Sequence, residues 1–137
     1  MIRNPRTFIS FDFDHDAPLR DLFAGQARNS RTPFNIENWS SKFALPQRTW
    51  EQTIEDKISR CHIMIVLVSP HTYRAVGVAK EIAMAQRKNV PYFGIYVSGA
   101  NSSTPLPAGL PRSRVITWTW DGIASMITRL SGEGKNA

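Results

Sequence analysis

Residues 62–69 read HIMIVLVS, and this short stretch decides the fold class. The six residues Ile63–Val68 are all apolar, so no face of this segment suits contact with water. A run of this kind is typical of a central strand in a parallel sheet, which helices cover on both faces. A strand with one face in solvent would instead alternate apolar and polar residues. The run therefore predicts an α/β protein built around this strand.

Strand and helix patterns alternate on both sides of this run. Further strands are expected at Thr7–Phe13, Pro33–Ile36, Val90–Val97 and Arg114–Trp118. Helices are expected between them: one capped by Asp16, one with a capping box from Thr49 to Gln52, one over residues 75–88, and one capped by Asp121 and stopped by Gly132. The alternation implies right-handed crossovers between parallel strands. We predict a flavodoxin-like three-layer sandwich, with helices on both faces of a five-stranded sheet in the order 2-1-3-4-5.

The composition indicates one domain. A chain of 137 residues that is 42% apolar can bury a core of its own. We predict a single domain over residues 1–131 and a flexible tail over 132–137. No apolar run approaches the roughly 20 residues of a membrane span. The first residues lack a secretory signal, and Cys61 has no second cysteine to pair with. We therefore expect a cytoplasmic protein that makes no use of a membrane.

The net charge does not by itself indicate a nucleic-acid partner. Lys and Arg total 17 and Asp and Glu total 11, which gives a formal charge of +6. The basic residues are scattered singly along the chain, a pattern typical of a solvated surface. The sequence offers no platform of interleaved aromatic and basic residues for single-stranded nucleic acid. Nucleic acid is accordingly the partner we expect least.

Ligands of this fold bind at the carboxyl ends of the strands, beside the switch point between strands 1 and 3. The first of these ends carries Asp12, Asp14 and Asp16, which would repel the phosphate that flavodoxins and P-loop proteins hold there. A phosphate-receiver domain needs an acceptor aspartate after strand 3, where this chain has Ser69. The acidic cluster lacks the glycine and distal glutamate of a calcium loop. We interpret it as a solvated turn, and we expect no metal.

Glu81 is the residue of the third predicted helix that spacing singles out. Val78, Ile82 and Ala85 mark the buried face of this helix, and Glu81 lies on its flank. Glutamate is seldom buried unless it is paired or used. Spacing alone leaves two interpretations: a carboxylate that reaches the ligand cleft, or a surface ion pair with a basic residue of the same helix.

Two motifs resemble those of the TIR family, in particular the short TIR-like proteins of the Thoeris anti-phage system. The first is FISF (Phe8–Phe11), followed within a few residues by an aspartate. The second is VLVSPHTYRAVGVAKEI (Val66–Ile82), an apolar strand, Ser-Pro, a short loop and a helix with Glu before an aliphatic residue. The resemblance extends over residues 7–131.

The resemblance implies an activity and a site. Many TIR domains cleave NAD at the nicotinamide–ribose bond with a glutamate on the third helix, a role that maps onto Glu81. The residues it implies for binding the substrate are Ser10, Phe11, Asp12, Trp39 and Ser69. NAD would be the substrate, and no cofactor is implied. The product would be ADP-ribose or a cyclic isomer that serves as a messenger for a separate effector protein, and self-association would accompany activation.

Two departures from the TIR pattern keep an alternative open. TIR helices commonly carry Trp four residues before the glutamate, whereas this chain has Gly77. The aspartate after the first strand is one residue out of register, as Asp14 or Asp16. The alternative function is a TIR-like protein–protein assembly module without catalysis.

Overall fold

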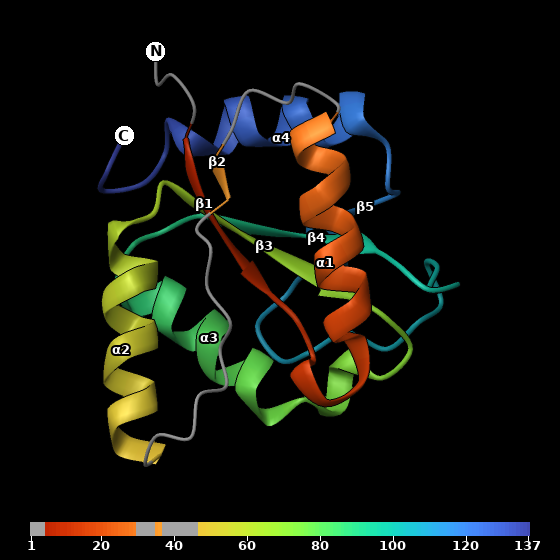
Figure 1. Ribbon diagram of the computed structural model, residues 1–137. Helices are drawn as coiled ribbons and strands as arrows, with labels where there is room; N and C mark the ends of the chain where they lie inside the picture. Colours follow the sequence, from red (N-terminus) through yellow and green to blue (C-terminus); the bar gives the residue numbers. More distant parts are fainter. Residues whose placement is uncertain (1–4, 30–34, 37–46) are drawn as a thin grey trace.

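The computed structural model describes residues 5–29, 35–36 and 47–137 of the chain (Figure 1). Its strands are β1 (Arg6–Ser10), β2 (Asn35–Ile36), β3 (Ile63–Val68), β4 (Tyr92–Tyr96) and β5 (Val115–Ile116). Its helices are α1 (Phe13–Asn29), α2 (Gln47–Arg60), α3 (Val76–Arg87) and α4 (Trp120–Ser131), with 3-10 turns η1 (Thr72–Arg74) and η2 (Arg112–Arg114). The predicted polar loop over residues 37–46, which contains Trp39, lies outside the described residues.

The strands form one parallel sheet in the order β2-β1-β3-β4-β5, which is the expected order. The two edge strands are short, and each pairs with its neighbour through two residues. The centre of the sheet is β3, in which Ile65 pairs with Ile9 of β1 and with Phe93 of β4. The predicted α/β class with a parallel sheet and flanking helices is confirmed.

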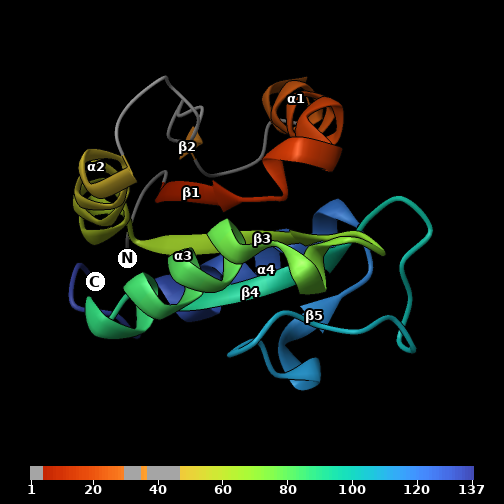
Figure 2. The same cartoon turned by 90° about the horizontal axis from the view of Figure 1, so that it is seen from below.

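Helices cover both faces of the sheet, as Figures 1 and 2 show. Side chains of α2 and α3 pack with Phe8, Met64 and Val66 in one core layer. Side chains of α1 and α4 pack with Ile9 and Ile65 in the other. Every residue of β3 is buried, because alternate side chains enter opposite layers and both layers are covered.

The apolar stripes expected on three helices are confirmed. The buried stripe residues are Trp50, Ile54 and Ile58 of α2, Val78, Ile82 and Ala85 of α3, and Ile123, Ile127 and Leu130 of α4. Helical periodicity predicts these positions well because residues three and four apart share one face. Cys61 is a buried core residue, also as expected.

The predicted start of the first helix is wrong. The first strand ends at Ser10 rather than at Phe13, and α1 begins at Phe13. The Asp12 carboxylate accepts a hydrogen bond from the backbone N–H of Asp14 at 3.2 Å, and the Asp12 carbonyl accepts one from that of Asp16 at 2.7 Å. Asp12 therefore caps the helix, and Asp16 lies inside its first turn.

Two other helix starts also differ from the expected ones. Helix α2 begins at Gln47, so Thr49 lies within the helix and is not its cap. Helix α4 is capped by Thr119, whose side chain accepts from the backbone N–H of Gly122. Asp121 lies in the first turn, where its charge is favourable near the helix N-terminus. The predicted stop at Gly132 is confirmed as the C-cap.

Residues 132–137, expected as a flexible tail, make contacts with the body of the domain. The Asn136 side-chain amide donates to the carbonyls of Ser59 at 2.8 Å and Cys61 at 2.9 Å. The backbone N–H of Lys135 donates to the carbonyl of Asn89 at 3.0 Å. These bonds hold the tail against the end of α2 and the loop before β4.

Candidate functional site at the carboxyl edge of the sheet

Two buried serines lie where β1 and β3 end side by side. Ser10 is the last residue of β1, and its Cα partner across the sheet is Val66 of β3. Ser69 follows the last residue of β3, and both serines are 0% exposed. The chain leaves these two neighbouring strands toward opposite halves of the sheet, so this edge is the switch point of the fold. Each serine binds a carboxylate that a helix supplies.

Ser10 binds Glu81 of α3. The Ser10 hydroxyl donates to Glu81 Oε1 at 2.6 Å, and Glu81 is only 3% exposed. Burial raises the pKa of Glu81 to about 8, while the smaller effect of the Ser10 hydrogen bond acts in the opposite direction. In the free protein this carboxyl group is therefore largely protonated at neutral pH.

The interpretation of Glu81 as a surface ion pair is wrong. The basic residues of α3 pair with α2 instead: Lys80 with Glu51, and Arg87 with Glu55. Glu81 lies deeper than the flank position that its spacing predicts, and it is one of the buried residues of α3. Among the residues that the structure describes, no salt bridge joins Glu81 to a cation, and a buried carboxyl with a raised pKa makes it a candidate site residue.

Ser69 binds Asp16 of α1. The Ser69 hydroxyl donates to Asp16 Oδ2 at 2.6 Å, and Asp16 is 2% exposed. The Thr72 hydroxyl extends the network: it accepts from the Ser69 backbone N–H at 2.8 Å and donates to the Leu67 carbonyl at 3.1 Å. The interpretation of the acidic cluster as a solvated turn is therefore wrong for Asp12 and Asp16, which are both buried, although Asp14 and His15 are exposed.

The comparisons with known proteins agree with this architecture. The family model described as "Thoeris protein ThsB, TIR-like domain" matches residues 8–102, a span that contains both serine–carboxylate pairs. The chain belongs to this TIR-like family. A solved structure, "Crystal Structure of a prokaryotic SEFIR domain", is 17% identical with a TM-score of 0.54, and the match covers 96% of this chain and 99% of the other. That likeness concerns the fold alone. No curated protein matches the chain.

The structure brings together some of the site residues predicted from the TIR-like resemblance. Ser10 and Glu81 are in contact, and Ser69 and Asp12 lie at the same edge with other partners. Phe11 is packed in the core layer of α1 and α4, whereas Ser10 faces α3. Trp39 lies outside the described residues. Asp16 was missed as a site residue, although its spacing of seven from the buried Phe23 places both on one helix face.

Trp50 lies beside the position where this TIR-like chain departs from its pattern. A side chain at Gly77 would meet the far edge of the Trp50 indole, with Cη2 at 3.8 Å from a Cβ at that position. Trp50 comes from α2 and is 9% exposed. An indole is thus present beside the helix turn before Glu81, supplied by α2 rather than by α3.

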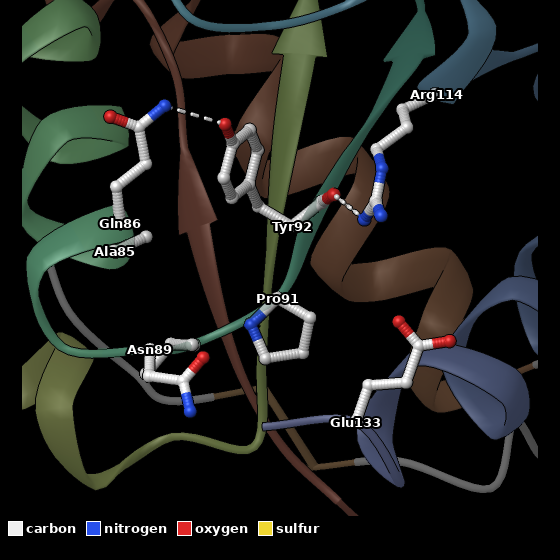
Figure 3. A pocket seen from close by; sticks show the side chains of 8 residues that line it. Ala85, Gln86, Asn89, Pro91, Tyr92, Arg114 and Glu133 are labelled. Carbon is white, nitrogen blue, oxygen red and sulfur yellow. Dashed lines mark hydrogen bonds between the residues drawn. The ribbon is translucent and has the colours of Figure 1, made fainter. Parts of the chain in front are cut away.

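A pocket of about 320 Å³ lies at the opposite end of the sheet (Figure 3). It surrounds the start of β4, and its described lining contains none of the predicted site residues. The Tyr92 hydroxyl accepts from Gln86 at 2.8 Å and donates to the Gly109 carbonyl at 2.6 Å. Because ligands of doubly wound sheets bind at the carboxyl ends of the strands, this hollow is not the expected site.

Within the described ranges, no group of three or more His, Cys, Asp or Glu residues is arranged to hold a metal ion. Over the same residues, no helix combines the length and apolar character that crossing a membrane requires.

Proposed function

We propose that the chain is an NAD-cleaving enzyme of the TIR type, with Glu81 as the catalytic residue and Ser10 as the residue that orients it. The observation that carries this proposal is the contact of 2.6 Å between Ser10 Oγ and the buried Glu81 carboxyl at the switch point. The family of the chain supports it, because the catalytic glutamate expected from the TIR resemblance is the residue found in this contact.

The chemistry needs one carboxylate. As the bond between the nicotinamide nitrogen and ribose C1′ breaks, its electron pair neutralises the ring nitrogen and positive charge develops on the ribose. A fixed carboxylate near the ribose stabilises that charge in the transition state. Glu81 is largely protonated in the free protein, but the cationic nicotinamide ring favours the charged form of a neighbouring carboxyl. Substrate binding would therefore ionise the catalytic group.

The acceptor at C1′ determines the product. Water gives ADP-ribose, and a second group of the same molecule gives a cyclic ADP-ribose isomer. In anti-phage defence of the Thoeris kind, the cyclic product would act in the cytoplasm as a messenger for a separate effector protein. Within this proposal NAD is the substrate and no cofactor takes part. Asp12, Ser69 and Trp39 remain the proposed substrate-binding residues, while the core position of Phe11 argues against direct contact.

The test is release of nicotinamide from NAD by the purified protein, with products resolved by chromatography. We expect Glu81→Gln to lower turnover by about 10²–10³-fold, because it removes the charge and keeps the shape. The matched control is Glu133→Gln, the same change at the exposed residue beside the opposite pocket. Equal turnover in wild type and Glu81→Gln, with matched melting curves, would contradict the assigned site.

The alternative is a TIR-like assembly module without catalysis. Two apolar side chains would be available for such assembly: Tyr73 in η1 and Val76 at the start of α3 are 40% and 68% exposed. Self-association and catalysis are compatible, and we expect turnover per molecule to rise with protein concentration. A protein that assembles at high concentration and releases no nicotinamide at any concentration would be the module instead.

A further inference from the structure

Asp12 and His15 form a contact that the proposed role of Glu81 does not use. His15 Nδ1 lies 2.7 Å from Asp12 Oδ2, while Asp12 Oδ1 accepts the backbone N–H of Asp14 at 3.2 Å. The Asp12 side chain is 8% exposed and that of His15 is 57% exposed. Since a carboxylate can only accept, Nδ1 of a neutral His15 imidazole carries the hydrogen in this contact, and Nε2 is then the ring nitrogen that can accept a proton. A buried aspartate thus orients an accessible imidazole.

The His71 ring stacks on the His15 ring. Their centroids are 4.8 Å apart and their planes differ by 23°. Ring nitrogens bind a metal along lines in the ring plane, so two nearly parallel stacked rings cannot point at one ion. The stack instead fixes the orientation of the His15 ring without using its nitrogens. This geometry suits proton transfer rather than metal binding.

The histidine stack lies at the same edge as Glu81. Asp12 is two residues beyond Ser10, so their Cα atoms are at most about 7 Å apart. His71 is held from the other side, because its backbone N–H donates to the Ser69 hydroxyl at 3.2 Å and that hydroxyl binds the buried Asp16. The buried Ser69 network therefore holds the backbone of the residue whose ring stacks on His15.

We infer that His15 is a second catalytic residue, the general base that takes the proton of the acceptor group, with Asp12 as its positioning residue. The inference rests on the proposed NAD cleavage. As nicotinamide leaves with the electron pair of the C1′–N bond, the acceptor oxygen forms a bond to C1′ and loses its proton to His15 Nε2. The imidazole then returns that proton to solvent. For water, the net products are nicotinamide, ADP-ribose and one proton.

The experiment is chemical rescue of His15→Ala. General-base catalysis contributes about 10²–10⁴-fold, so we expect nicotinamide release to fall by at least about 10²-fold. Added imidazole should restore much of the rate and saturate, because the His15 side chain is exposed and a small base can reach its place on the His71 ring. Pyrazole, a ring of the same size and a far weaker base, should not. Asp14→Asn is the control on the same helix turn.

The outcomes separate this inference from the proposed function. A wild type that releases no nicotinamide overturns both. An active wild type with an equally active His15→Ala overturns the inference alone. The inference is also overturned if His15→Ala loses nicotinamide release, neither imidazole nor pyrazole restores it, and the melting curve of the variant matches wild type. Restoration by imidazole and not by pyrazole supports the inference, since a purely structural role would not distinguish the two additives.

Discussion

The two serine–carboxylate pairs at the carboxyl edge have the same hydrogen-bond length and different surroundings. Ser10–Glu81 and Ser69–Asp16 both measure 2.6 Å, and both carboxyl groups are buried. Ser69 is also bonded to Thr72 and to the backbone of His71, and Asp16 is thereby joined to the turn before α3. In the described part of the chain, the Glu81 side chain is hydrogen-bonded to Ser10.

This difference distinguishes Asp16, whose network holds the fold, from Glu81, which is available for chemistry. A buried polar group in a satisfied network stabilises one arrangement of the chain. A buried carboxyl with few partners keeps a high free energy of ionisation, and burial raises the pKa of Glu81 to about 8. We therefore expect substitutions at Asp16 to change stability and substitutions at Glu81 to change activity.

Asp16→Ala tests the structural role of the Ser69–Asp16 hydrogen bond. The change leaves the buried Ser69 hydroxyl without its acceptor, and we expect the free energy of unfolding to fall by about 2–3 kcal/mol. Asp14→Ala, at an exposed site in the same helix turn, should lower it by less than about 1 kcal/mol. Urea unfolding measures both. Equal effects would show that the Ser69 network contributes nothing beyond the favourable charge at the start of α1.

The second prediction concerns the pH dependence of NAD cleavage. If the Glu81 carboxylate is the active form, kcat/KM should rise about tenfold per pH unit up to about pH 8 and then level. Ser10→Ala should move this limb to higher pH, because the Ser10 hydrogen bond lowers the pKa of Glu81. A kcat/KM that instead falls above about pH 8 would mean that the protonated form of Glu81 is the active one and that Glu81 acts as a proton donor.

The sequence predicts the core better than the site, for a physical reason. Burial of Val78, Ile82 and Ala85 follows from helical period alone, and the run Ile63–Val68 defines the central strand. The cap of α1 depends on where β1 ends, which pairing with β3 decides. The prediction therefore places the cap at Asp16, whereas the structure has it at Asp12.

The sequence pattern does little to predict contacts between segments that are far apart along the chain. The Ser10–Glu81 contact joins residues 71 positions apart, and only the TIR-like resemblance named both of its members. The Ser69–Asp16 contact joins residues 53 apart, and the resemblance named Ser69 without its partner. The stack of His15 on His71 was missed, because neither histidine has a spacing that distinguishes it.

The last prediction concerns the slope of stability with pH, which tests the state of Glu81 without any substrate. The ordinary pKa of a glutamate is 4.5, which holds for the unfolded chain, and that of Glu81 is about 8 in the fold. Between these two pH values the folded protein therefore holds a proton that the unfolded chain has lost. Stability from this group is fully present below about pH 4.5 and is lost as pH rises toward 8. The slope is at most about 1.4 kcal/mol per pH unit.

Glu81→Gln is the variant that isolates this slope. Its amide keeps an oxygen for the Ser10 hydroxyl and does not titrate, so the variant should lack the Glu81 part of the slope. Near pH 4 the two proteins should differ little, because Glu81 of the wild type is then largely neutral in both the folded and the unfolded chain; near pH 8 the variant should be the more stable one. Urea unfolding at several pH values provides the measurement. Parallel curves for the two proteins would mean that Glu81 is charged throughout this pH range, which would contradict its raised pKa.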